Sequence, residues 1–165
     1  MTNGTNVIIS GSQSYAKRPN LSLKKYRKNS IAATNALIEF DKEEAAVKVH
    51  IEEYLKEFPA CSVITGGMDG VEYVAEFYAL ENKIKSLKFK PLWKNISGAL
   101  NKRAGYDSIL SMVSKAESAL LIVSEKADSR TRMIIREMKR LNKPVRVVTL
   151  QEQTDHSSLP WILEP

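Results

Sequence analysis

The sequence predicts a three-layer α/β fold, in which helices cover both faces of a mainly parallel, five-stranded sheet. Most of the expected strands are continuous apolar runs, which is typical of parallel strands that are buried on both faces. Expected helices alternate with these runs along the chain, as in sheets built from crossover connections. The 165 residues, 43% of them hydrophobic and 27% charged, are ordinary for one globular domain.

The expected elements follow from apolar runs, helical spacing and turn residues. Five strands are expected, at residues 6–10, 60–65, 87–93, 119–124 and 145–150. A helix at about 41–58 repeats Val47, Ile51, Leu55 and Phe58 at helical spacing, and Pro59 ends it. The second helix carries Val71, Val74, Ala75 and Tyr78 on one face. A third, at about 102–117, presents Ile109, Met112, Val113 and Ala116, and a fourth turns Met133, Ile134, Met138 and Leu141 inward.

Residues 1–150 are expected to form a single domain, in which the polar and basic residues 12–36 are a loop insertion. The tail at 151–165 is polar until an apolar segment around Trp161, which we expect to pack on the domain or on a partner. The lone cysteine, Cys61, lies in an apolar run and is expected to be core. No stretch approaches the ~20 apolar residues of a membrane span, and no signal-like start is visible, so a cytoplasmic protein without a membrane partner is predicted.

The net charge of +6 is unevenly distributed. No acid lies between Gly11 and Ile38, but six basic residues do: Lys17, Arg18, Lys24, Lys25, Arg27 and Lys28. A second acid-free run, residues 83–103, adds seven more basic residues. This segregation favours an anionic partner, either a nucleotide or a nucleic acid, although a solvated loop is the simpler explanation of a charge run.

Four turns are expected to surround one crevice. In open parallel sheets, ligands bind beyond the carboxyl ends of the strands, near the point where the strand order reverses. The turn at Gly11-Ser12, the turn at Gly66-Gly67 and the loops at 91–105 and 124–131 all follow strands and precede helices. They should therefore meet at that edge of the sheet.

The GGMDG turn at 66–70 has the chemistry of a phosphate site, because glycines permit close backbone approach and the N–H groups of a following helix can hold an anion. Glu72 would accept hydrogen bonds from a ribose. The alternative is a turn that needs glycine only for its geometry. Ser129-Arg130-Thr131 would place two hydroxyls and a guanidinium at a helix start, unless these residues merely cap the helix.

Several other chemistries lack support in the sequence. The glycine turn is neither a Walker loop nor a GxGxxG fingerprint, so ATPase and dehydrogenase functions are not indicated. The two histidines, His50 and His156, lie in unrelated contexts and suggest neither a metal cluster nor a Ser–His pair. No metal and no cofactor are predicted.

The succession VIISGS, VITGGMDGVEYVAEFYA, FKPLW, KRAGY, SALLIVS with SRT, and KPVRVV, spread over about residues 6–149, resembles the SLOG superfamily of Rossmann-like proteins. It is most similar to the small bacterial and phage branch related to YpsA and YspA. The resemblance implies a site for a nucleotide or a nucleotide-derived ligand. The residues it carries over are Gly11, Ser12, Gly66, Gly67, Ser129 and Thr131, with Glu72 as the acidic residue and Trp93 and Arg103 at the border, and Arg130 joins these candidates from its place between Ser129 and Thr131.

Two departures from the family pattern bear on catalysis. The AG motif continues into Tyr106-Asp107 where this branch has an Arg-Asn pair. The last loop reads EKADSRTRMI instead of the PGGxGTxxE of the phosphoribohydrolases, and no glutamate follows Thr131 at their spacing. A hydrolase without these groups would be slow or inactive by that mechanism, whereas binding would survive their loss.

Three functional hypotheses remain open. The first is a nucleotide-binding sensor or sequestering protein. The second is an enzyme that acts on an N-glycosidic bond, with Glu72 or Asp107 as the carboxylate. The third is a nucleic-acid-binding protein that uses Lys17 to Lys28 and Lys83 to Arg103 as a track for phosphates, with Tyr15, Tyr26 and Trp93 as stacking candidates. Tyr73, Phe77 or Trp161 would supply an apolar patch for a homo-oligomer. The lysine- and asparagine-rich composition suits a phage protein, which would act in the host cytoplasm.

Overall fold

The computed structural model describes residues 5–94, 97–124 and 127–150. Their strands are β1 (Thr5–Gly11), β2 (Ala60–Thr65), β3 (Lys85–Lys88), β4 (Ser118–Ser124) and β5 (Val145–Leu150). They form one sheet in the order β3-β2-β1-β4-β5, and all neighbouring strands are parallel. The predicted fold class, a Rossmann-like α/β sheet with interleaved helices, is confirmed.

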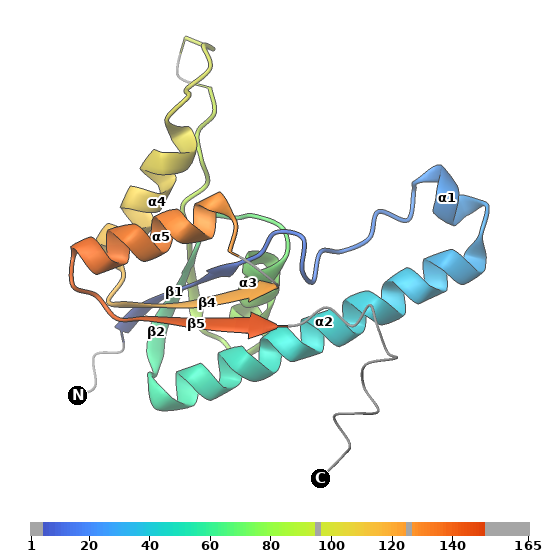
Figure 1. Ribbon diagram of the computed structural model, residues 1–165, viewed down its shortest axis with the longest axis horizontal. Coiled ribbons are helices and arrows are strands. Elements are labelled where there is room, and N and C mark those ends of the chain that lie inside the picture. The colour runs from blue at the N-terminus through green and yellow to red at the C-terminus, as the bar shows by residue number, and fades with distance from the viewer. Residues whose placement is uncertain (1–4, 95–96, 125–126, 151–165) are drawn as a thin grey trace.

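Helices pack against both faces of this sheet (Figure 1). The packed helices are α2 (Ser30–Glu57), α3 (Val71–Glu81), α4 (Ala104–Lys115) and α5 (Ser129–Arg140), and the short α1 (Lys24–Arg27), which has no buried residue, precedes α2. Because side chains alternate along a strand, Val7 and Ile9 of β1 join a core with α2 and α3. Ile8, between them, joins the opposite core with α4 and α5. The sheet is therefore buried on both faces at its centre, as the continuous apolar runs indicate.

Predicted and observed elements differ mainly at the edges of the sheet. β2 and β5 have the predicted bounds, and all seven residues of β4 are buried. The third strand was expected at 87–93 but lies at Lys85–Lys88. The apolar residues at 87–93 do not mark the strand, because β3 is an edge strand in which only Leu87 is partly buried. Leu141, expected to face inward, is 39% exposed because it follows the last turn of α5 as its C-cap.

The interpretation of residues 12–36 as a loop was wrong in part, because α2 begins at Ser30 and not near Asp41, and the short α1 precedes it. The Asn29 side chain caps α2 by accepting a hydrogen bond from the Ala32 N–H at 3.0 Å. Alanines 32, 33 and 36 then favour a helix by propensity. The first half of α2 and α1 extend away from the sheet (Figure 1). The first buried residue of α2 is Val47.

Cys61 is exposed, which corrects its assignment to the core. It is the second residue of β2, and this strand becomes buried only from Ser62 onward. Its sulfur contacts Asn6 Oδ1 at 3.5 Å. The apolar run therefore starts before the part of the strand that the helices cover.

Within the described ranges, no helix has both the length and the apolar character needed to cross a membrane. Residues 151–165, including Trp161 and the packing expected for the tail, lie outside the described residues.

We expect the two halves of α2 to differ in local stability. Amide hydrogens in residues 32–41 should exchange faster than those in residues 47–54, because only the latter belong to a part of the helix with buried side chains. Asn29→Ala should speed exchange in the first half further, through a loss of about 1 kcal/mol of local stability. Hydrogen-exchange mass spectrometry would measure both effects.

Asn35→Ala is the matched control, because Asn35 is an exposed residue inside the same helix and does not cap it. Equal protection of the two halves of α2, or equal effects of the two substitutions, would contradict this prediction.

Candidate functional site

A pocket of about 280 Å³ lies where the four predicted turns converge. This is the carboxyl edge of the sheet beside β1 and β4, between which the order of connection reverses. Gln13 follows β1, Met68 follows β2, and Trp93 follows β3. The starts of α4 and α5 complete the pocket with Gly105, Tyr106, Ile109, Ser129, Arg130 and Met133.

The pocket has one apolar side and a few polar groups. Met68, Trp93, Tyr106, Ile109 and Met133 supply the apolar and aromatic surface. The Trp93 ring lies against the start of α4, since a Cβ at Gly105 would be in van der Waals contact with it at 3.4 Å. The polar side chains are Gln13, Ser129 and Arg130. An apolar wall with a small number of placed polar groups is the usual composition of a small-molecule site.

Glu72 lies beneath this pocket and is 1% exposed. Its Oε1 accepts hydrogen bonds from the Gly66 N–H at 2.7 Å and the Met68 N–H at 3.2 Å. Its Oε2 accepts the Ser10 hydroxyl at 2.5 Å and lies 3.4 Å from Arg130 Nε. One buried carboxylate thus joins the end of β1, the double-glycine turn and the start of α5, and both of its oxygens are engaged inside the protein.

Arg130 brings a positive charge to the pocket wall although it is only 8% exposed. Its guanidinium occupies the space beside Gly66, where a Cβ would come within 1.9 Å of Nη2. Nη2 also contacts Met112 Sδ at 3.4 Å. Arg130 is the second residue of α5, so the positive end of the helix dipole adds to its charge. Because Glu72 pairs with the guanidinium, the charge of Arg130 is largely balanced, and the amino end of α5 is what favours an anion on this side of the pocket.

Two of the predicted site residues, Gly11 and Ser12, join β1 to β4 and do not line the pocket. A Cβ on Gly11 would lie 1.8 Å from the Ile122 carbonyl oxygen, so only glycine permits this approach. The Ser12 hydroxyl accepts the Ser124 N–H at 3.0 Å. These contacts fix the spacing of the two central strands where the pocket opens.

At the double-glycine turn, Gly67 has a φ of +73°, which a side chain would strain. The aliphatic parts of Lys88 and Lys90 cover it, since both lie within about 3.1 Å of where its Cβ would be. Two lysine stems therefore run over the turn in which a phosphate site was predicted.

At the start of α5, the capping residue is Asp128, whose carboxylate accepts the Thr131 N–H at 2.8 Å. Thr131 itself is fully buried, and neither Ser129 nor Thr131 is the cap. Ser129 and Arg130 line the pocket.

Arg103 and Asp107 form an exposed ion pair at 3.7 Å near the start of α4. The Arg103 guanidinium also lies 5.5 Å from the centre of the Tyr106 ring. Tyr106 lines the pocket, but Arg103 and Asp107 do not. They stand at its rim.

The aromatic candidates have different surroundings. Tyr15 is 7% exposed and belongs to the core, which corrects its suggestion as a base-stacking residue. Tyr26 is partly buried with Lys25 over its ring at 4.9 Å, and Trp93 is 51% exposed. Phe77 is 42% exposed, whereas the Tyr73 hydroxyl accepts a hydrogen bond from Arg18 at 3.2 Å.

The sequence interpretation missed several pocket residues: Gln13, Met68, Tyr106, Ile109 and Met133. Gln13 and Met68 directly follow the two glycine turns, which was an available signal. Met133 and Ile109 lie on the apolar faces of α5 and α4, which the sequence assigns to the core. These faces continue from the core into the pocket, so their spacing does not distinguish pocket residues from core residues.

No protein-family model matches the chain, and no curated protein or solved structure gives a significant match. Among the described residues, no group of three or more His, Cys, Asp or Glu side chains is arranged to hold a metal ion.

Glu72→Gln should destabilise the protein by about 3 kcal/mol, because it leaves Arg130 in a buried position without its carboxylate. Glu76→Gln in the same helix is the matched control. Glu76 also accepts a hydroxyl hydrogen bond, from Thr65, and pairs with a cation, Lys88. Because that pair is partly exposed, its loss should cost less than about 1 kcal/mol. Denaturant unfolding would compare them, and an equal cost for both variants would contradict the assigned role of Glu72.

Proposed function

We propose that this chain is a divergent SLOG-type protein that binds a nucleotide or a nucleotide-derived small ligand, as a cytoplasmic sensor or sequestering protein. The observation that carries the proposal is the pocket itself. It combines an aromatic and apolar wall with a buried arginine at the point where the strand order reverses.

The two sides of the pocket suit the two parts of a nucleotide. Trp93 and Tyr106 offer ring surfaces for a base. Arg130, Ser129 and the amino end of α5 offer hydrogen-bond donors and positive charge for a phosphate. The volume of about 280 Å³ is just below the ~300–1,000 Å³ usual for ligand pockets, which favours one nucleoside unit over a dinucleotide.

The surroundings of the two candidate carboxylates, Glu72 and Asp107, favour binding without turnover. The enzyme hypothesis needs Glu72 or Asp107 to act on a glycosidic bond. Glu72 is buried and already receives hydrogen bonds from Ser10, two backbone N–H groups and Arg130. Asp107 is exposed at the rim, where it pairs with Arg103.

A thermal-shift screen of mono- and dinucleotides, cyclic dinucleotides and ADP-ribose derivatives tests the proposal. A ligand at 100 times its Kd should stabilise the protein by about 2.7 kcal/mol. Chromatography of each hit after incubation shows whether it is consumed. Saturable stabilisation of an unchanged ligand is the expected result, and turnover would replace the proposal by the enzyme hypothesis.

Trp93→Ala should weaken binding of the best ligand at least fivefold, because stacking of a base on an aromatic ring contributes ~1–3 kcal/mol. The side chain is half exposed, so its removal should leave the fold intact. Leu92→Ala is the control, since Leu92 is the adjacent residue, is 75% exposed and does not line the pocket. Isothermal titration calorimetry would measure both, and equal affinities for the two variants would remove Trp93 from the site.

A further inference from the structure

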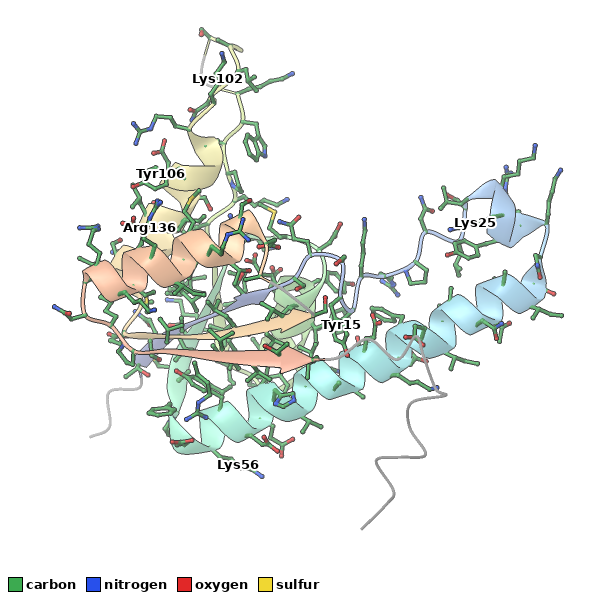
Figure 2. The ribbon with its side chains drawn as sticks, in the orientation of Figure 1. Tyr15, Lys25, Lys56, Lys102, Tyr106 and Arg136 are labelled. Carbon is green, nitrogen blue, oxygen red and sulfur yellow. The ribbon has the colours of Figure 1, made fainter. Side chains whose placement is uncertain are left out.

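Six basic side chains lie on a projection that we call the basic arm, residues 17–28, which rests on the first half of α2. All six are exposed: Lys17, Arg18, Lys24, Lys25, Arg27 and Lys28. Figure 2 shows Lys25 near the far end of this arm, well away from the sheet. The chain between Gly11 and Ile38 contains no acid.

A second projection, the basic hairpin, consists of residues 90–94 and 97–103. A bridge between Lys94 and Leu100 pairs its two sides. Lys90, Lys94, Lys102 and Arg103 are exposed on it, and no acid occurs in residues 83–103. Figure 2 shows Lys102 near its tip, on a different side of the molecule from Lys25.

Both projections leave from the rim of the pocket. Gln13, which lines the pocket, precedes the basic arm by a few residues, and Trp93, which also lines it, belongs to the basic hairpin. The arm and the hairpin carry ten of the 25 basic residues and no acid, so the rest of the chain has 15 basic residues and all 19 acidic residues. Positive charge is therefore concentrated on the two structures that extend from the pocket.

We propose that the basic arm and the basic hairpin form a binding surface for single-stranded nucleic acid, which runs from one projection to the other across the mouth of the pocket. A chain of phosphates is a ligand that the cations of both projections can neutralise at the same time. A flexible single strand can bend between two projections and offer unstacked bases to Tyr26 and Trp93, whereas a rigid duplex cannot. This surface goes beyond the small-ligand proposal and does not require the pocket to be filled.

The acidic side chains near the arm define where the phosphates lie. Glu39 and Glu43 of α2 line the groove of about 500 Å³ between α2 and the arm, opposite Lys17, Arg18 and Lys25. Because these carboxylates would repel phosphates inside the groove, the strand follows the outer surface of the arm. The exposed side chains of Lys24 and Lys28 are on α1 and next to it, at the end of the arm.

Fluorescence anisotropy of a labelled 20-nucleotide oligo-dT, titrated with the full chain over a range of salt concentrations, tests the proposal. The variant K24Q/K25Q/K28Q removes three exposed lysines from the arm. With a contribution of ~0.7 per phosphate contact on a single strand, the slope of log K against log salt should fall by about 2. The same relation gives about 100-fold weaker binding at 0.1 M salt.

The control variant K56Q/K115Q/K139Q removes the same charge from three exposed lysines outside both projections, and it should bind oligo-dT as the unmodified protein does. Stabilisation by mononucleotides should be the same in both variants, so that a failure of the pocket is distinguished from a failure of the arm. Absence of oligonucleotide binding, equal effects of the two variants, or tighter binding of a duplex of the same length would each overturn the proposal. Binding of anionic vesicles without binding of oligo-dT would also overturn it and would assign the arm to a lipid surface.

Discussion

The arrangement of the pocket depends on one buried ion pair, between Glu72 of α3 and Arg130 of α5. A carboxylate without water is costly unless hydrogen bonds and an opposite charge compensate it. Glu72 obtains this compensation from three separate parts of the chain: Ser10 at the end of β1, the backbone of the glycine turn, and Arg130. Any movement of one of these segments would leave a buried charge poorly solvated. The ion pair therefore holds the rim of the pocket in one geometry.

Two glycines leave the space that this ion pair and the neighbouring strands occupy. Gly66 leaves the space that the Arg130 guanidinium fills, and Gly11 lets β1 approach the Ile122 carbonyl of β4. In both places a methyl group would overlap an atom that the structure needs where it is. The structure therefore requires that these two positions have no Cβ. At Gly66 the space is filled by Arg130, the charged side chain that lines the pocket. The double-glycine turn and the buried arginine form one structural unit.

The sequence was sufficient for the centre of the fold but not for its periphery. β4 is buried along its whole length, so its apolar run identifies it, whereas β3 at the edge has no such run. The first half of α2 buries no residue and is marked by the Asn29 cap and its alanines, so hydrophobic periodicity could not reveal it. The glycine turns indicated where the pocket lies. The partners of Glu72 could not be foreseen, because Ser10 and Arg130 lie 62 and 58 residues from it along the chain.

The distribution of charge gives the two proposed sites different electrostatic properties. Arg130 is buried, so its interaction with an anion would be little screened by salt and would depend closely on geometry. The cations of the arm and the hairpin are exposed, so they attract polyanions at a distance, hold them without strict geometry and lose that attraction as salt increases. Because those cations are exposed on projections, they stay hydrated, which limits the cost of concentrating like charges. A ligand that carries one phosphate would bind mainly in the pocket, and a chain of phosphates would bind mainly to the projections.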